Sequence, residues 1–488
     1  MTAKTLSFNS VPFDKNTMIL YCIFTPLGDQ QNGQCFILFT VRLFNRVNNM
    51  TYTIDWNKIN EEAAGLLSAY IQYDTTNPPG NERRSAEFLA NILKKDGYSP
   101  ELLNFNDKRA SLVCRLRGSS NEKPLLMLSH MDVVGAVADD WKVAPFSGVI
   151  KDGYVWGRGT VDCKGMGIME LMAFILLKRA GVTPKRDIIL LASADEEAGG
   201  DAGVEWVVRN HWDKVAAGYV LNEGGMGIKG MFGKDIMMPC FGEKGPLWIK
   251  LKARGQSGHG SMPTAENPND KLVYALERIA RYETKIMLLP EVKSVLLEAG
   301  KSMKFPVPLI APLFINELFL NIIRKRLKKL KKINAIIRNT ISITNMKSGF
   351  KENVIPSESE AILDCRLLPG QDKDAFIEEL RRVIHDPDID IETLQYHAPS
   401  ESSSKDRFME VIKKVTLRNH PNVPFYPILG AGFTDSRFFR EKGAIAYGFI
   451  PCLFSQEEID TMHGVNERIS LRCLGDGIKN IFDLCKEF

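Results

Sequence analysis

The segment Leu125-Leu126-Met127-Leu128-Ser129-His130-Met131-Asp132 places a histidine and an aspartate directly after a short apolar run. Apolar runs of this length between turn residues predict buried strands. The pattern recurs at residues 188–194, which Asp195-Glu196-Glu197 follow, and at residues 219–222, which Glu223 follows. Because the carboxyl ends of parallel strands meet at one edge of an open sheet, we expect these polar side chains to lie close together.

Helical patterns alternate with these strands. Residues 55–71, 87–95 and 165–180 have helical spacing, and Gly181 and Pro184 end the last of them. Residues 111–116 predict a further strand. Strands that alternate with helices predict an α/β fold with a mixed, largely parallel sheet flanked by helices.

Composition agrees with a large globular protein. The 488 residues are 44% hydrophobic and 25% charged, which excludes disorder and coiled-coil arrays, and the length predicts about three structural units or one large core with an insertion. The 63 basic and 59 acidic residues give a net charge of +4, so we expect no nucleic-acid partner. Nine scattered cysteines argue against a disulfide scaffold and favour a reducing, cytoplasmic location.

Residues 1–50 form an N-terminal extension of unknown role. Two apolar runs, 18–27 and 35–44, are each about ten residues long, whereas a bilayer-spanning helix needs about 20. The first run has no basic segment close before it and no small-residue cleavage site after it, so we expect no signal peptide. A dispensable extension is favoured, and a membrane hairpin is the alternative.

The polar clusters after the strands predict a metal site when they are taken together. Alone, a His-x-Asp pair is more often structural, a Glu-Glu pair is more often solvated, and Asp162 could cap the helix that follows it. His259 and His463, however, stand beside glycines that let a backbone approach a ligand closely. Imidazoles and carboxylates without a thiolate cluster suit two zinc ions per subunit, with cobalt or manganese as substitutes.

Two features of this set suit a pair of ions. One carboxylate could bridge ions about 3.5 Å apart, as in two-metal hydrolases. In Glu196-Glu197, one side chain can bind metal while its neighbour acts as general base.

The same motifs, in order, resemble the M20 metallopeptidase family: His130-x-Asp132, Gly157-Arg158-Gly159 before Asp162, Glu196-Glu197, Glu223, Ser257-Gly258-His259 and His463. The resemblance covers about 55–488. The family includes aminoacylases, carboxypeptidases of the S and G2 types, acetylornithine deacetylase and succinyl-diaminopimelate desuccinylase. The surroundings of Glu223 and residues 242–248 are most similar to the branch of carboxypeptidase S and N-acyl-amino-acid hydrolases.

The resemblance implies a role for each matched residue. His130 and Glu223 would hold one zinc ion, Glu197 and His463 the other, and Asp162 would bridge them. Glu196 would be the general base that takes a proton from the attacking water and later delivers it to the leaving nitrogen. Asp132 would orient His130, the peptide bond after Asp162 would be cis, and Cys163 would be structural.

The resemblance also implies an architecture. An α+β, ferredoxin-like lid and dimerisation domain (243–396) would interrupt a zinc-peptidase-like catalytic domain (51–242 and 397–488). His259 of the lid would stabilise the oxyanion in the partner's active site of a homodimer. Asn353, Arg366 and the loop with Gly430, Gly432 and Thr434 would bind the carboxylate or amide of the substrate. Phe433 stands where relatives more often have Gly or Ser.

We therefore expect a hydrolase of N-acyl amino acids or short peptides that carry a free carboxylate, with a biosynthetic deacylase as the alternative. Two other classes are a binding protein that has lost catalysis and a metal-dependent nuclease or phosphatase. The complete ligand set argues against the first, and the lack of a basic groove or phosphate loop argues against the second. Residues 305–337, with a basic run at 324–332, predict an extra lid helix, or else an amphipathic helix that touches membrane or guides an acyl chain.

Overall fold

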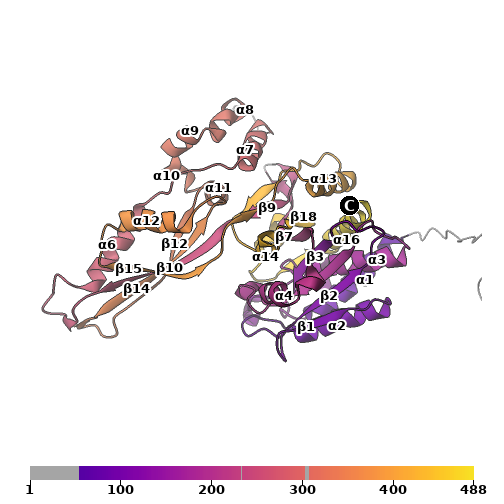
Figure 1. Cartoon of the computed structure of the whole chain (residues 1–488), viewed down its shortest axis with the longest axis horizontal. Helices are drawn as coiled ribbons and strands as arrows, with labels where there is room; N and C mark the ends of the chain where they lie inside the picture. The colour runs from indigo at the N-terminus through magenta and orange to yellow at the C-terminus, as the bar shows by residue number, and fades with distance from the viewer. Residues whose placement is uncertain (1–53, 232, 303–306) are drawn as a thin grey trace, which may run out of the picture. The chain divides into compact units, whose positions relative to one another are not determined.

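The computed structural model describes residues 54–231, 233–302 and 307–488 (Figure 1). The extension predicted for residues 1–50, with its two apolar runs, lies outside the described residues. None of the helices in the described ranges combines the length and the apolar content that a bilayer-spanning segment needs.

A mixed ten-stranded sheet in the order β1-β2-β6-β3-β7-β18-β9-β16 carries the predicted strands, with β17 beside β9 and β8 beside β7. Its four central strands, β6, β3, β7 and β18, pair in parallel, and the strands toward both edges are mostly antiparallel. The strands are β1 (Glu101–Asn104), β2 (Ala110–Leu116), β3 (Leu125–His130), β6 (Ile188–Ser193), β7 (Tyr219–Met231), β8 (Lys234–Met238), β9 (Cys240–Glu243), β16 (Ser400–Glu401), β17 (Ile428–Gly430) and β18 (Ile445–Phe454).

Helices cover both faces of this sheet. Side chains alternate between faces along a strand, so Leu125 and Met127 pack on one side and Leu126 and Leu128 on the other. The first face is covered by α1 (Trp56–Ile71), α2 (Arg83–Lys95), α3 (Lys164–Arg179), α13 (Arg407–Asn419) and α16 (Leu471–Glu487), and the second by α4 (Val204–Asn210), α5 (Trp212–Val215) and α14 (Ser436–Glu441). The mixed α/β architecture predicted from the sequence is confirmed.

Two element boundaries differ from the sequence prediction. Helix α2 begins at Arg83 and not at residue 87. Its first turn is mostly polar, so the apolar periodicity that predicts a helix starts only later in the sequence. Strand β7 continues to Met231 and does not end at residue 222, because its second half forms a hairpin with β8. Glu223 therefore lies within a strand and not directly after one.

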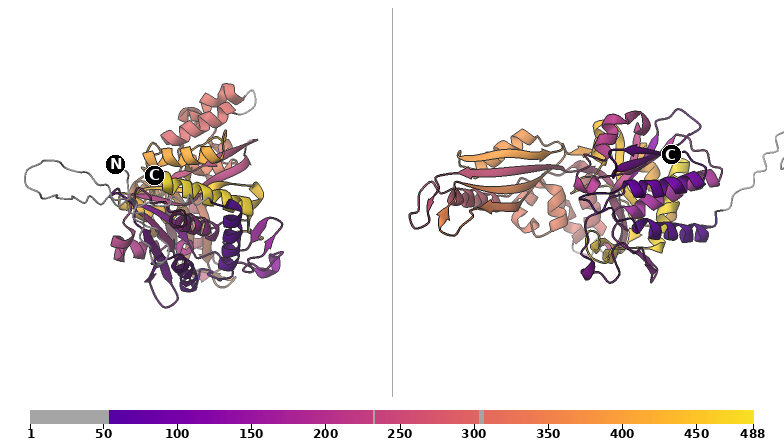
Figure 2. Two further views of the ribbon diagram at one scale, coloured as in Figure 1. Left: turned by 90° about the vertical axis from the view of Figure 1, so that its right-hand side faces the viewer. Right: turned by 90° about the horizontal axis from the view of Figure 1, so that it is seen from below.

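A second sheet is antiparallel, has the order β12-β14-β10-β15 and is called the lid sheet below. Alternate residues of β10 from Leu247 to Ala253 are buried against α6 and α12. The elements are β10 (Gly245–Arg254), α6 (Pro268–Arg281), β12 (Thr340–Ser348), β14 (Glu358–Leu367), α12 (Lys373–Ile384) and β15 (Ile389–Tyr396). Helices α6 and α12 lie along one side of this sheet (Figure 2), as expected for an α+β lid, whose limits of 243 and 396 remain a prediction.

Between α6 and β12 the chain forms several short helices, called the helical insertion below: α7 (Pro290–Ser302), α8 (Val307–Ile310), η3 (Ala311–Ile315), α9 (Glu317–Ile322), α10 (Arg324–Leu327) and α11 (Lys331–Ile337). The sequence predicted one helix over 305–337, which is wrong for the described part of that range. Pro308 and Pro312 restrict the helix there, and Asn316 caps a new one by accepting a hydrogen bond from the Phe319 amide at 3.0 Å.

Smaller elements complete the described residues: a sheet of β4 (Ile150–Lys151), β5 (Tyr154–Trp156) and β19 (Arg468–Ser470), a ribbon of β11 (Gly258–His259) and β13 (Val354–Ile355), α15 (Gln456–Asp460), η1 (Ala138–Asp140) and η2 (Glu196–Ala198). A disulfide joins Cys452 of β18 to Cys473 of α16. The cysteine pattern, which favoured a reducing compartment, did not predict this bond.

Candidate metal centre

The five side chains predicted as metal ligands meet at the carboxyl ends of the parallel strands. His130 is the last residue of β3, Glu223 lies in β7, and Glu197 lies in η2 just after β6. Asp162 comes two residues before α3, and His463 follows α15. Sheet topology therefore collects ligands that are far apart in the sequence.

Asp162 lies between two groups of side chains. Its Oδ1 is 2.9 Å from Nε2 of His130, and Nε2 of His130 is 3.5 Å from Oε1 of Glu223. On the other side, Oδ2 of Asp162 is 3.0 Å from Nε2 of His463, which is 3.3 Å from Oε1 of Glu197. Each oxygen of one carboxylate thus faces a different imidazole–glutamate pair.

These separations fit shared metal ions. Ligand atoms that bind one tetrahedral ion at about 2.1 Å lie about 3.4 Å from one another. His130, Asp162 and Glu197 each offer an atom within 4.8 Å of the others. Oε1 of Glu197 is buried, and among the described residues its polar neighbour is the His463 imidazole at 3.3 Å, so a cation at this place would complete its contacts. The residues present therefore fit a pair of metal ions.

The electrostatics of the cluster also call for positive charge. Burial and the neighbouring Glu223 raise the pKa of Glu196 well above its usual value, and burial and Asp162 do the same to the pKa of Glu223. Hydrogen bonds to Asp162 and Glu197 raise the pKa of His463 to about 10. Without a metal, the crowded carboxylates therefore favour protonation of Glu196, Glu223 and His463. Bound dications would take the place of those protons.

Asp132 fixes several of these groups at once. Nδ1 of His130 lies 3.0 Å from the Asp132 carbonyl oxygen, so it donates there when Nε2 faces a metal. The Asp132 carboxylate accepts hydrogen bonds from the amides of Glu196 (3.1 Å) and Glu197 (3.0 Å). Burial raises the pKa of Asp132, but the hydrogen bond and charge of His130 outweigh it, so the pKa is lowered and the carboxylate stays ionised.

Asn77 holds Asp132 and is itself held by Asp195 and Arg109, and the sequence did not identify Asn77 or Arg109 as functional. Nδ2 of Asn77 donates to Asp132 at 2.8 Å and to Asp195 at 3.0 Å. Arg109 pairs with Asp195 and donates to Oδ1 of Asn77 at 2.6 Å. The sequence gives no sign of this contact, because Asn77 and Asp132 are 55 positions apart in the chain.

Glu467 holds the loop that carries Asp162. Its buried carboxylate accepts hydrogen bonds from the backbone amides of Gly159 (3.0 Å), Val161 (2.8 Å) and Asp162 (3.2 Å). It also pairs with Arg158 at 2.7 Å. The Asp162–Cys163 peptide bond is cis, as the resemblance implied. A single acid gave no sequence signal for this role.

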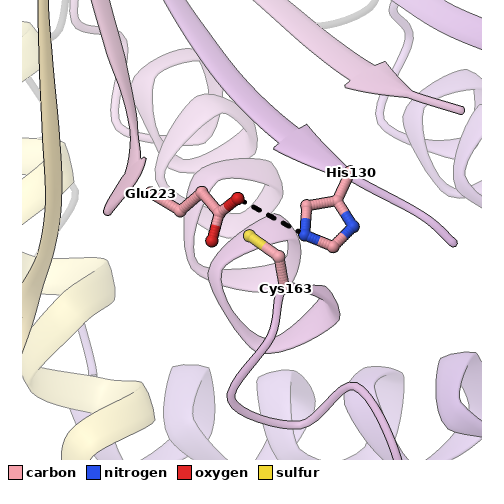
Figure 3. Close-up of side chains that lie close together, drawn as sticks. All are labelled: His130, Cys163 and Glu223. Atoms are coloured by element: carbon pink, nitrogen blue, oxygen red, sulfur yellow. Dashed lines mark ion pairs between the residues drawn. The ribbon is translucent and has the colours of Figure 1, made fainter. Parts of the chain in front are cut away.

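Cys163 lies close to His130 and Glu223 (Figure 3). Burial and the charge of Glu223 raise the pKa of its thiol well above the usual value. That Cys163 is structural and not a ligand stays a prediction.

The loop predicted to bind substrate lies next to the strand of Glu223. Oγ1 of Thr434 donates to buried Glu243 at 2.7 Å and accepts from Nδ2 of Asn222 at 3.1 Å. The Gly430 carbonyl accepts from the Lys244 amide at 3.2 Å, and Gly432 is exposed. These contacts connect the loop with β7, with the last residue of β9 and with Lys244, which follows β9.

Arg366 of the lid sheet reaches the same loop. Its guanidinium lies 5.1 Å from the centre of the Phe433 ring, which also has Arg437 at 4.6 Å and the His397 ring at 6.3 Å. Arg366 also pairs with Asp364, through hydrogen bonds of 2.7 and 2.9 Å. Phe433 thus forms a wall between two guanidinium groups.

His259 and Asn353 lie together, but no contact joins them to the metal cluster within the described residues. His259 of β11 pairs with Val354 of β13, and the Asn353 carbonyl accepts from the Gly260 amide at 2.8 Å. The exposed imidazole of His259 accepts a hydrogen bond from the Ser261 amide at 3.1 Å.

Comparison with known proteins gives one consistent family. Residues 126–487 match Peptidase family M20/M25/M40. Human N-fatty-acyl-amino acid synthase/hydrolase PM20D1 is 31% identical over 370 residues, which cover 74% of this chain and 73% of that protein.

Two solved structures share the fold. The M20 family metallo-carboxypeptidase Sso-CP2 from Sulfolobus solfataricus has a TM-score of 0.69 at 19% identity and covers 87% of this chain and 98% of its own. The Bacillus subtilis YXEP protein, a dinuclear metal binding peptidase from the M20 family, has a TM-score of 0.55 at 12% identity and covers 88% and 98%. The chain therefore belongs to peptidase family M20/M25/M40 and is a hydrolase that acts on amide bonds.

Proposed function

We propose that the protein is a dizinc hydrolase that cleaves the amide bond of N-acyl amino acids, or of short peptides with a free carboxylate. One observation carries this proposal: the two oxygens of Asp162 face two separate imidazole–glutamate pairs. His130 and Glu223 would hold one ion and His463 and Glu197 the other, with Asp162 between them. Imidazole and carboxylate ligands suit zinc, and cobalt or manganese would substitute.

Such a metal pair polarises a carbonyl and lowers the pKa of water. The protein's own contribution to proton transfer is Glu196. Its amide is held by Asp132 at 3.1 Å, and its carboxyl lies near Glu223 and His130 without being needed as a ligand. Glu196 takes the proton of the attacking water and delivers it to the leaving nitrogen, which no ligand can do while it binds metal.

Arg366, Asn353 and the loop with Gly430, Gly432 and Thr434 would select the substrate. Two of the Arg366 nitrogens donate to Asp364, and within the described residues Nη1 has no hydrogen-bond partner, so it remains available for a carboxylate. The printed name of the human relative, an N-fatty-acyl-amino acid synthase/hydrolase, favours an N-acyl amino acid with a long acyl chain. Phe433 offers an apolar wall next to this site.

The decisive experiment combines metal analysis with a substrate panel. We expect two zinc ions per chain and hydrolysis of N-fatty-acyl amino acids in preference to dipeptides. Preference for acetylornithine or succinyl-diaminopimelate would favour the biosynthetic deacylase, and absence of amide hydrolysis by the metal-loaded protein would refute the proposal.

The role of Glu196 is tested in the same assay. Glu196→Gln should lower turnover at least about 10³-fold with the metal content intact. Glu87→Gln, which changes an exposed glutamate of α2, is the matched control and should leave turnover unchanged. Activity retained by Glu196→Gln would show that another group moves the proton.

We also propose that the active unit is a homodimer formed through the lid. The imidazole of His259 is exposed and makes no contact with the metal cluster of its own chain among the described residues, which supports a role at the site of a second subunit. Val273 and Tyr274 on α6 and Met346 on the edge strand β12 are exposed apolar side chains that a partner would cover.

A further inference from the structure

The helical insertion exposes large apolar side chains directly beside basic ones. We propose that this surface, the apolar-basic face, binds an anionic lipid bilayer and holds the enzyme at a membrane surface. It is defined by Leu309, Leu318 and Ile322 together with Lys325, Arg326 and Lys329. This inference is independent of the substrate proposed above.

The apolar residues of this face are exposed to an unusual degree for their type. Leu309, Leu318 and Ile322 are 71%, 77% and 76% exposed. Leu318 and Ile322 are four residues apart on α9, so they point to the same side of the helix. Helices α8 and α9 both pack against η3, which brings Leu309 into the same part of the insertion.

This exposure is not that of a loosely attached segment. Leu320, which lies between Leu318 and Ile322 on α9, is buried together with Leu327 and Ile337 in the main hydrophobic cluster. Glu291 of α7 accepts a hydrogen bond from Ser404 at 3.2 Å. The insertion thus has one packed face and one face that presents leucine and isoleucine to solvent, at a cost of apolar surface left in water.

Charge on the insertion is strongly one-sided. Residues 307–337 contain seven Lys or Arg and one acid, Glu317, which pairs with Lys293 at 3.0 Å. Lys325, Arg326 and Lys329 are exposed and form no ion pair within the described residues. Lys325 and Arg326 lie in α10 and Lys329 follows it, and α10 contacts α9, so these bases lie next to the helix that carries Leu318 and Ile322.

An anionic bilayer suits both halves of this face. Apolar side chains of an interfacial helix enter the boundary of the acyl chains, and the bases next to them contact anionic headgroups. A second copy of the same face would instead bring two sets of unpaired positive charges together. A bilayer surface is therefore the occupant that the observations favour over self-association.

Vesicle co-sedimentation of the full, metal-loaded chain tests the proposal. We expect binding to vesicles of phosphatidylcholine with about 30 mol% phosphatidylserine, little binding to pure phosphatidylcholine, and weaker binding as salt rises. Absence of binding to the anionic vesicles would overturn the proposal.

Two variants locate the surface within the full chain. Lys325→Glu/Arg326→Glu/Lys329→Glu and Leu318→Ser/Ile322→Ser should each lower the vesicle partition coefficient at least about tenfold. The matched controls are Lys94→Glu/Lys95→Glu/Lys413→Glu, which makes the same charge change on exposed lysines, and Val149→Ser/Ile150→Ser, which removes exposed apolar residues elsewhere. Both should bind like the unmodified chain.

The remaining outcomes are decisive against the proposal. Binding that survives in both test variants would assign membrane contact to another part of the chain. A change in sedimentation coefficient in Leu318→Ser/Ile322→Ser without any vesicle binding by the unmodified chain would assign the face to a second copy. Hydrolysis of a short-chain, soluble substrate should be equal in the unmodified chain and in all four surface variants. A failure of the membrane proposal therefore leaves the proposed hydrolase function separately testable.

Discussion

Asp162 shows how one side chain can organise the centre. Its two oxygens lie 2.9 and 3.0 Å from different imidazoles, and its backbone amide is held by Glu467 at 3.2 Å. Burial alone would raise its pKa, but hydrogen bonds with His130 and His463 lower it below the usual value, so the carboxylate stays ionised. An ionised carboxylate in a fixed orientation is the property that a bridging ligand needs.

Asp132 positions metal ligands and the proposed general base together. It orients His130 and also fixes the amides of Glu196 and Glu197. We expect Asp132→Ala to weaken metal affinity about 10- to 100-fold, as measured by competition with a chelator. Asp139→Ala, which changes an exposed acid in η1, should leave that affinity unchanged. Equal affinities for Asp132→Ala and the unmodified chain would contradict the positioning role.

At the scale of elements, the loop before α3 depends on Glu467. The Glu467→Gln variant keeps the shape of the side chain but leaves the buried Arg158 without its charge partner. We expect the free energy of unfolding to fall by about 3–5 kcal/mol, measured with denaturant. Metal affinity should fall as well, because the amide of Asp162 loses its anionic acceptor.

Glu457→Gln is the control for that experiment. Glu457 pairs with Arg468 at 3.0 Å but is largely exposed, so the loss should be below about 1 kcal/mol. Similar losses in the two variants would show that the clamp of Glu467 on the loop adds little to stability.

Contacts between α13 and α16 make a prediction about pH. Hydrogen bonds from Arg418 and Lys414 lower the pKa of Glu487 from 4.5 to about 2. Because the pKa of Glu487 is lower in the folded chain than in the unfolded chain, its ionised carboxylate stabilises the fold at pH values above the unfolded-state pKa. This stabilisation is lost as the pH falls toward 2. The pair is partly exposed, so we expect Glu487→Gln to cost about 1 kcal/mol or less near neutral pH.

That difference should shrink as the buffer is taken from about pH 7 to about pH 3, because the carboxyl of the unfolded chain becomes protonated there while that of the folded chain is still largely ionised. Denaturant unfolding of the two metal-free proteins measures it. A difference that grows on acidification would mean that Glu487 stabilises the folded state in its protonated form.

The elements that the sequence predicted correctly share one physical property. Strands β3 and β6 and helix α3 are buried on all sides, so their apolar runs are continuous, and the polar residues after each strand mark the edge of the sheet. The functional contacts that were missed join distant residues: Gly159 and Glu467 are 308 positions apart. No local pattern records such a pairing. The breaks in the helical insertion were missed although their signals are local. The prediction followed the long apolar and basic composition and gave too little weight to Pro308, Pro312 and the capping residue Asn316.

At the scale of the whole molecule, the exposed His259 leads to a prediction about subunits. If His259 serves the partner's site, then Glu196→Gln and His259→Ala remove groups that belong to different subunits but to one active site. A heterodimer of the two variants then contains one site with both defects and one intact site.

Mixing equal amounts of the two inactive variants under conditions that exchange subunits should therefore restore activity. Random pairing gives heterodimers for about half of the dimers, each with one intact site of two, so about a quarter of the unmodified activity is expected. The control mixes Glu196→Gln with Asp162→Asn, two defects within a single subunit's share of the site, and should restore nothing of comparable size. If differently tagged subunits co-purify yet the first mixture stays inactive, His259 does not act across the dimer, and its exposed position on the lid ribbon requires another explanation.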